Sequence, residues 1–197
     1  HIPGLRDPLV DRHEWYVMPE FSTFASDDAQ DMAATLLGEA LESQLVHDVA
    51  LSHSLAQRES FWAIRESIPE AQVREGPSIK HDISVPIGDI PEFITIVCAE
   101  IAAYLPGIRP CIFGHVGDGN LHFNLQAPQD MDQATYAPHA AALHEIVYRH
   151  VQAMKGSISA EHGIGQAKRA QLAATKDPHA LDLMRKIKAV LDPDGRM

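Results

Sequence analysis

Apolar and polar residues alternate most regularly between residues 111 and 124, which read C-I-F-G-H-V-G-D-G-N-L-H-F-N. A period of two is typical of a strand with one buried face, and Asp118-Gly119 favours the two-residue turn of a β-hairpin. Counting outward from that turn predicts that His115 lies opposite His122. The other predicted pairs are Gly117 with Asn120, Val116 with Leu121, and Phe113 with Asn124. One face of this hairpin carries the polar side chains His115, Asn120, His122 and Asn124, and the other carries the apolar side chains Ile112, Val116, Leu121, Phe123 and Leu125.

The remaining elements follow from periodicity, caps and prolines. Helices are predicted over residues 27–44, 56–68, 90–105, 131–155, 166–174 and 178–191. Strands are predicted over residues 15–24, 46–52, 79–86 and 156–161, with the hairpin over 110–127 and a loop over 70–78. Ser26 is a suitable N-cap for the first helix, Pro69 ends the second, and Pro19 restricts the first strand to an edge or a bulge.

Two observations decide the predicted fold class. The hairpin requires antiparallel pairing, and several strands have one apolar and one polar face. In residues 79–86, for example, Lys80, Asp82 and Ser84 share the polar face. We therefore predict an α+β fold, in which a ferredoxin-like antiparallel sheet is covered by helices on one face. The open polar face would carry Lys80, His115, His122, Asn124 and Glu161.

Composition and charge argue against several classes of protein. With 16 basic and 27 acidic residues among 197, the net charge of −11 argues against a nucleic-acid partner. No apolar run is long enough to span a bilayer, and no signal-peptide pattern is present. Cys98 and Cys111 are too few for a disulfide framework, so we expect free thiols and a cytoplasmic location. A homodimer is left open. The chain begins at His1 and stops in L-D-P-D-G-R-M, and we expect it to be part of a longer polypeptide.

The polar face of the hairpin is the first candidate site. Facing residues of a hairpin have Cβ atoms about 5 Å apart, so the imidazoles of His115 and His122 could bind one metal ion. Glu161 is the natural third ligand, since two histidines and one carboxylate suit zinc or a similar divalent ion. His162 follows directly and could act as a general base. The alternatives are surface histidines beside a turn, a solvated glutamate and a histidine that caps a turn.

Two basic residues are candidates for binding a carboxylate. Arg65 lies in the predicted helix F-W-A-I-R-E-S-I-P, and arginine binds carboxylates through two parallel hydrogen bonds. Lys80 lies on the polar face of its strand. Each could instead form a surface ion pair, for example Arg65 with Glu66.

Four motifs taken together resemble one known family. They are G-H-V-G-D-G-N-L-H-F-N (114–124), E-H-G-I-G (161–165), F-W-A-I-R-E (61–66) and I-K-H-D-I-S-V-P (79–86). This set is similar to the C-terminal domain of FAD-linked oxidases of the vanillyl-alcohol-oxidase-like superfamily. The branch that it resembles holds D-lactate dehydrogenase, the glycolate oxidase FAD subunit and D-2-hydroxyglutarate dehydrogenase. The resemblance covers nearly the whole chain. It implies that residues 14–197 form the substrate and metal domain, and that residues 1–13 are a linker from an N-terminal FAD-binding domain.

The resemblance also implies roles for single residues. His115, His122 and Glu161 match ligands of a divalent metal, zinc or manganese, and His162 matches the catalytic base. Residues that match the positions holding the substrate carboxylate are Arg65, Lys80 and Asn124. Asn120 would lie beside the flavin. The implied reaction oxidises a D-2-hydroxy acid to a 2-oxo acid, with the Cα hydride passing to FAD. The FAD-binding domain lies outside this chain, so we expect the chain alone to be inactive. The alternatives are another alcohol or a larger hydroxy acid as substrate, or a non-catalytic metal-binding or interaction domain.

Overall fold

The computed structural model describes residues 2–22 and 29–196, which form two compact units. The first unit is His1–Arg74 and the second is Glu75–Met197. The predicted boundary between a linker over 1–13 and a domain over 14–197 stays a prediction. Across the described residues, every helix is too short or too polar to cross a membrane.

The first unit contains the helices α1 (Ala29–Glu42), α2 (Leu55–Glu66) and α3 (Ile68–Arg74). The side chain of Ser54 caps α2 by accepting the N–H of Gln57 at 3.3 Å. Helix α2 ends before Pro69, as predicted, but a new helix then begins at once. Pro69 is the second residue of α3, where its missing N–H costs nothing, so the predicted loop over 70–78 is wrong as far as Arg74.

Two strands predicted in the first unit are wrong. Residues 15–22 and 46–52 form no strand. A strand needs a hydrogen-bonded partner strand, and residues 2–22 and 29–74 contain no strand. Pro19 also removes one donor, and Trp15 and Tyr16 are each 54% exposed. The last two residues of the predicted strand over 15–24 and the predicted cap Ser26 lie outside the described residues.

The second unit is built on one short antiparallel sheet. Its strands are β1 (Ser78–Ile79), β2 (Asp82–Ser84), β3 (Arg109–His115) and β4 (Asn120–Gln126). Strand β4 is central, with β3 on one side and β1 and β2 on the other. Its helices are α4 (Ile90–Tyr104), α5 (Gln133–Tyr136), α6 (Ala140–Ala153), α7 (Arg169–Thr175) and α8 (Pro178–Leu191). Short 3₁₀ turns span Ile87–Asp89 (η1), Val116–Asp118 (η2) and Ala137–His139 (η3).

A fourth position completes the sheet beside β2. Ser157 pairs with Ser84 in an isolated antiparallel bridge, with both N–H···O distances at 2.9 Å. The order across the sheet is therefore Ser157, β2, β4 and β3, which is the order of a ferredoxin-like βαββαβ motif. The predicted α+β class is confirmed. The predicted strand over 156–161 is reduced to this single bridge.

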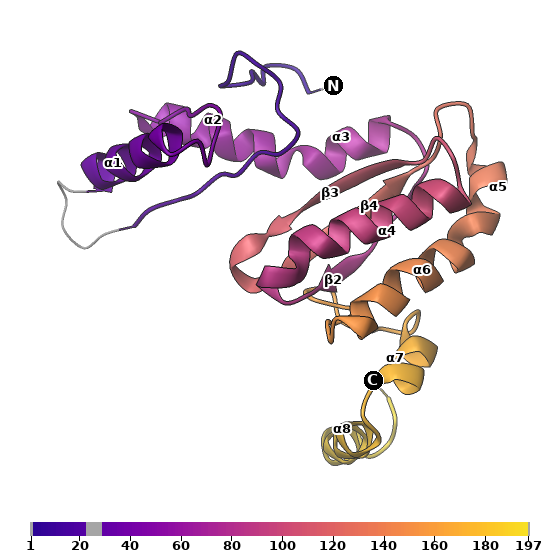
Figure 1. The fold of residues 1–197 in the computed structure, drawn as a ribbon. Helices are drawn as coiled ribbons and strands as arrows, with labels where there is room; N and C mark the ends of the chain where they lie inside the picture. The colour runs from indigo at the N-terminus through magenta and orange to yellow at the C-terminus, as the bar shows by residue number, and fades with distance from the viewer. Residues whose placement is uncertain (1, 23–28, 197) are drawn as a thin grey trace. The chain divides into compact units, whose positions relative to one another are not determined.

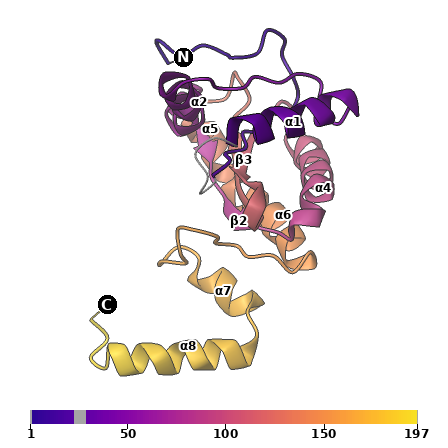
Figure 2. The ribbon, with the colours of Figure 1, turned by 90° about the vertical axis from the view of Figure 1, so that its left-hand side faces the viewer.

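Helices α4 and α6 cover one face of the sheet, and both Figure 1 and Figure 2 show them on the same side of the strands. The core lies between them and the apolar face of β4. Phe93 of α4 and Phe123 of β4 are fully buried and meet edge to face, with ring centroids 5.6 Å apart. Each such ring contributes roughly 1.5–3 kcal/mol by its burial. The polar face of β4 points away from this helical layer.

The hairpin register differs from the prediction by two residues. His115 lies opposite Asn120, and Phe113 lies opposite His122. The loop contains η2 and Gly119, whose φ of 77° suits glycine. Gly119 also accepts the N–H of Val85 through its carbonyl, so its pairing beside β2 sets where β4 begins. A shift of two residues keeps every strand side chain on its predicted face. Val116 is the exception, because it lies in the loop and is 56% exposed.

The two cysteines are free, as predicted. Cys98 and Cys111 are half-buried, and burial raises the pKa of both thiols.

Candidate active site

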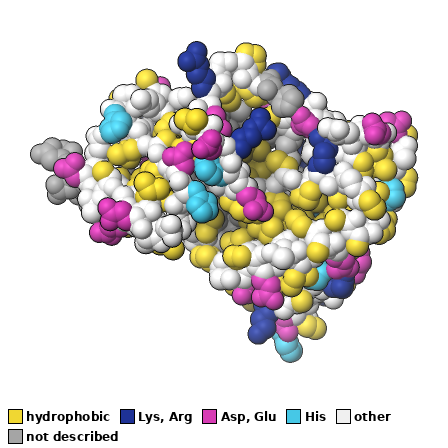
Figure 3. All heavy atoms as spheres, turned by 45° about the horizontal axis from the view of Figure 1, so that its top comes forward, with side chains coloured by type: hydrophobic (Ala, Val, Ile, Leu, Met, Phe, Trp, Pro, Cys, Tyr) yellow, Lys and Arg dark blue, Asp and Glu magenta, His cyan; other side chains and the backbone are white. Residues whose placement is uncertain are grey.

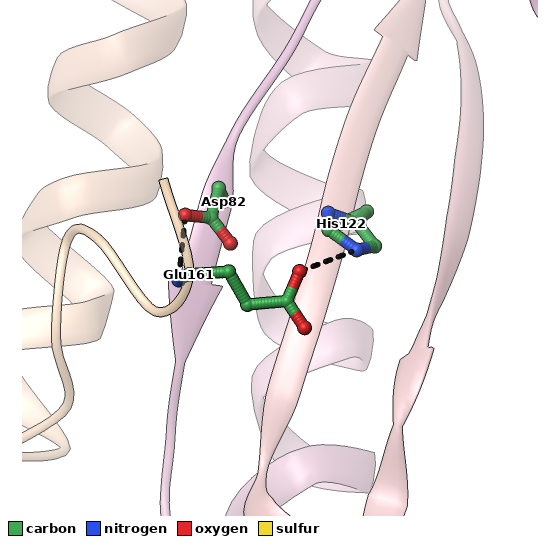
Figure 4. Close-up of side chains that lie close together, drawn as sticks. All are labelled: Asp82, His122 and Glu161. Carbon is green, nitrogen blue, oxygen red and sulfur yellow. Dashed lines mark hydrogen bonds and ion pairs between the residues drawn. The ribbon is translucent and has the colours of Figure 1, made fainter. Parts of the chain in front are cut away.

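The candidate site lies on the polar face of β4, opposite the helical layer. His122 is a β4 residue, and the register places Asp82 of β2 on one side of it and Phe113 of β3 on the other. Glu161 comes from the bend that follows the bridge at Ser157. Figure 4 shows the Glu161 carboxylate directed toward the His122 ring, with Asp82 close to the Glu161 backbone. Three segments distant in the sequence therefore meet at one point.

Glu161 connects the two predicted histidines. Its Oε1 lies 3.2 Å from His115 Nδ1, and its Oε2 lies 3.5 Å from His122 Nε2. The two imidazole centroids are 6.5 Å apart, because the observed register places the histidines diagonally rather than opposite each other. Figure 3 shows histidine and acidic side chains next to one another at the molecular surface. The structure thus brings together the three predicted ligands.

The donor set suits a divalent metal ion. One ligand atom each from Asp82, His122 and Glu161 lie within 4.8 Å of one another, and His115 reaches the same glutamate. Imidazole nitrogen and carboxylate oxygen are the donors that zinc and manganese share. The residues present therefore fit such an ion, although their role as ligands stays a prediction.

Asp82 is the buried anchor of the site, with 4% of its surface exposed. Its Oδ2 accepts the backbone N–H of Glu161 at 2.9 Å and that of His162 at 2.8 Å. Burial acts to raise the pKa of Asp82, but the two N–H groups and the nearby His162 and Lys168 outweigh it, and the pKa is lowered. The carboxylate is therefore ionised in the folded chain at neutral pH.

His162 lies beside the other histidines and is open to solvent. Its ring stacks on that of His122 with centroids 5.8 Å apart, and its Nδ1 lies 3.7 Å from Asp82 Oδ2. Its side chain is 69% exposed, so an entering ligand can reach the imidazole. This placement fits the predicted general base.

The predicted substrate and cofactor residues divide into two groups. Asn124 is buried on the polar face of β4, and the register of β1 and β2 places exposed Lys80 beside it. Asn120 is also buried, and its Nδ2 donates to Asp82 Oδ1 at 3.3 Å. Arg65 lies on α2 in the first unit, whereas the other three belong to the second unit. The roles of all four stay predictions.

Sequence reasoning placed Asp82 on the polar face but assigned it no role. A signal was available, since aspartate is depleted in strands and one inside a strand needs hydrogen-bond donors around it. Those donors come from a segment almost eighty positions later in the chain. Local sequence patterns do not reveal that pairing.

A second histidine cluster, also missed, lies on the helical side of β2. His81 is 1% exposed, and its Nδ1 lies 2.8 Å from the Phe123 carbonyl oxygen. Its Nε2 lies 2.9 Å from Nδ1 of His144 on α6, and the His144 ring stacks on Tyr148. Burial, aided by the charge of His144, lowers the pKa of His81 to about 3. His81 is therefore neutral and serves the packing of the sheet on α6.

Comparisons with known proteins show which proteins this chain is similar to. A D-2-hydroxyglutarate dehydrogenase of Xanthomonas citri pv. viticola is 39% identical over 191 residues, which are 96% of this chain and 40% of that relative. The protein of the same name from Stutzerimonas stutzeri is 36% identical over 183 residues, 93% of this chain and 39% of the relative. A mitochondrial D-2-hydroxyglutarate dehydrogenase of Arabidopsis thaliana is 34% identical over 200 residues, 99% of this chain and 34% of the relative.

The chain thus spans two fifths or less of the length of these relatives. The family model for the C-terminal domain of FAD linked oxidases matches residues 2–197. The four motifs and the ferredoxin-like sheet agree with that match. The chain therefore belongs to the family of FAD linked oxidases, as their C-terminal domain.

Proposed function

We propose that this chain is the substrate- and metal-binding domain of a flavin-dependent D-2-hydroxy-acid dehydrogenase. The reaction converts the C–OH group of the substrate to C=O, with loss of the hydroxyl proton and of the Cα hydrogen as hydride. The observation that carries the proposal is the meeting of His115, His122 and Glu161 beside the exposed ring of His162. A site that only bound metal would have no use for a base at that place.

The chain's own residues perform three tasks in this proposal. His162 accepts the hydroxyl proton of the substrate. Lys80 and Asn124 bind its carboxylate, and Arg65 keeps the carboxylate-binding role that the family resemblance implies. The sheet holds Lys80 and Asn124 on one face, so that the substrate hydroxyl and the base are oriented toward each other before reaction.

Two groups outside the chain complete the chemistry. Bound FAD supplies a two-electron acceptor for the hydride, and a divalent ion supplies positive charge where negative charge develops on the substrate oxygen. The ion would be held by His115, His122 and Glu161. The FAD would be held mainly by a further domain, in keeping with the small part of the relatives' length that this chain spans.

The names of the relatives favour D-2-hydroxyglutarate within the proposed substrate class. D-lactate, glycolate and larger hydroxy acids are the competing substrates. A cytoplasmic location and a homodimer are further parts of the proposal. Light scattering of the purified FAD-containing protein tests the homodimer.

Anaerobic flavin reduction tests the proposal. The FAD-containing protein is mixed with glycolate and with the D- and L-isomers of 2-hydroxyglutarate and lactate. The flavin absorbance near its visible maximum is followed. We expect bleaching by a D-2-hydroxy acid, and none with His162→Ala, which removes the base but retains the metal. Bleaching by His162→Ala at the rate of the parent protein would refute the role of His162. A flavin that no hydroxy acid reduces would refute the proposed function.

A further inference from the structure

We propose that Asp82 is the positioning residue of this site, and that its carboxylate holds Glu161 and His162 on the sheet. The inference deepens the proposed function, since it rests on Glu161 as a ligand and His162 as the base. Asp82 itself acts through the backbone of these two residues rather than on the substrate.

The segment that carries Glu161 and His162 has little support from the sheet ladder. Beyond the bridge of Ser157 with Ser84, one longer bond of 3.3 Å joins the N–H of Ala160 to the Asp82 carbonyl oxygen. The next two N–H groups then turn to the Asp82 side chain, at 2.9 and 2.8 Å. The carboxylate of Asp82 thus replaces the neighbouring backbone where the predicted strand over 156–161 ends early.

The hydrogen bonds of Asp82 explain why the residue is buried and ionised. One oxygen accepts both backbone N–H groups, and the other accepts the side-chain N–H of Asn120. A carboxylate is a stronger acceptor than a neutral group and can accept all three bonds at once. The geometry therefore fixes the backbone from which the Glu161 side chain reaches both His115 and His122.

Positioning and direct metal binding are alternative roles for Asp82, because its carboxylate also lies within 4.8 Å of the ligand atoms of His122 and Glu161. They make opposite predictions for Asp82→Asn. The amide oxygen of asparagine can accept the two backbone N–H groups. Its NH₂ group can then donate to Asn120 Oδ1, a buried oxygen without a hydrogen-bond partner among the described residues, once that amide rotates. Positioning therefore survives in Asp82→Asn, whereas a direct ligand would be lost.

Amide hydrogen exchange of the unmodified 197-residue chain is the first test, because it needs no variant. The N–H groups of Glu161 and His162 should exchange more slowly than those of an unstructured peptide of the same sequence, although both side chains are exposed. In Asp82→Ala this protection should be lost at both positions, and in Asp82→Asn it should be retained. Unprotected amides in the unmodified chain would overturn the proposal.

Calorimetric titration with Zn²⁺ and with Mn²⁺ is the second test. Loss of a supporting hydrogen bond should weaken metal binding by about 10- to 100-fold in Asp82→Ala, whereas Asp82→Asn should stay close to the unmodified chain. Asp192→Asn is the matched control, since Asp192 is 8% exposed and accepts the N–H of Arg196 at 2.7 Å. It should bind metal normally.

The outcomes separate this inference from the proposed function. Equal weakening by Asp82→Asn and Asp82→Ala would show that Asp82 acts as a ligand and would overturn the positioning role. Unchanged affinity in both variants would overturn it as well. Circular dichroism shows whether Asp82→Ala folds. If it does not fold, the exchange rates of the unmodified chain and of Asp82→Asn still test the positioning role. A flavin that no hydroxy acid reduces would refute the reaction, while leaving both of these measurements as they stand.

Discussion

Acid should destabilise the second unit through His81, well before the carboxylates are protonated. The ring lies between the Phe123 carbonyl and His144, with Tyr148 and Lys168 also nearby. Burial, with the charge of His144, lowers its pKa from 6.5 to about 3. The folded form therefore resists protonation at pH values where the unfolded chain accepts a proton.

The sign and size of the effect follow from linkage. Below pH 6.5 the unfolded state binds one more proton than the folded state, so the free energy of unfolding falls as the pH falls. The slope is about 1.4 kcal/mol per pH unit until the folded pKa is reached. From pH 7 to pH 5 the loss from His81 alone is therefore about 2 kcal/mol. The lowered pKa of His144 adds to the loss with the same sign. Above pH 7 this contribution to stability is fully present.

The assay must report on the second unit alone. Both tryptophans, Trp15 and Trp62, lie in the first unit, so tryptophan fluorescence would follow the wrong part of the chain. Amide hydrogen exchange of buried β4 and α4 residues at pH 5, 6 and 7, corrected for intrinsic exchange, measures the required free energy. His81→Gln is the comparison, since glutamine keeps a donor and an acceptor but cannot titrate. A loss between pH 7 and pH 5 as large in His81→Gln as in the parent chain would refute the assignment to His81.

Three further substitutions test the site and the fold. In a Zn²⁺ titration, His122→Ala should weaken Zn²⁺ binding at least tenfold. The control His179→Ala, at an exposed position of α8, should leave the affinity unchanged. Equal affinities of the parent chain and both variants would remove His122 from the ligand set. Phe123→Ala should lower the free energy of unfolding by about 3–5 kcal/mol, because it leaves a cavity in the core. Leu183→Ala, at a position 58% exposed, should lower it by less than about 0.5 kcal/mol. Urea unfolding followed by circular dichroism compares the two variants, and similar midpoints would contradict the assigned core. Gly119→Ala should lower the free energy of unfolding by more than about 1 kcal/mol, because the φ of Gly119 is 77° and a Cβ would lie 2.1 Å from the Val85 carbonyl oxygen. A stability equal to that of the parent chain in the same assay would contradict the observed turn.

The elements that local patterns predicted well are helices whose ends are marked by nearby residues, such as the cap Asp177 before Pro178 in α8. The prediction of helix α8 over 178–191 matches its observed bounds, and α4 ends within one residue of its prediction. The hairpin faces were also correct, although its register was not. The register depends on the bond between Gly119 and Val85, which joins segments that are remote in sequence. The absent strands over 15–22 and 46–52 have the same cause, since an extended segment becomes a strand only beside a partner.

The candidate site also has one part that local patterns predicted and one part that they did not. Alternation placed His115 and His122 on one face, and the structure brings Glu161 to both of them. The part that could not be predicted is how the segment of Glu161 is held. That depends on side-chain to backbone bonds from Asp82, and no periodic signal accompanies bonds of this kind.

The order of segments across the sheet also has a consequence for biosynthesis. The bridge of Ser157 with Ser84 joins the last sheet segment to β2, across both helices of the covering layer and the whole hairpin. As the chain leaves the ribosome, β2, α4, β3 and β4 are available before residue 157 is made, and α6 follows β4 directly. Glu161 and His162 come after all of them, and non-local pairing of this kind is the slow part of folding. A nascent chain can therefore pack its core before Glu161 and His162 join the candidate site.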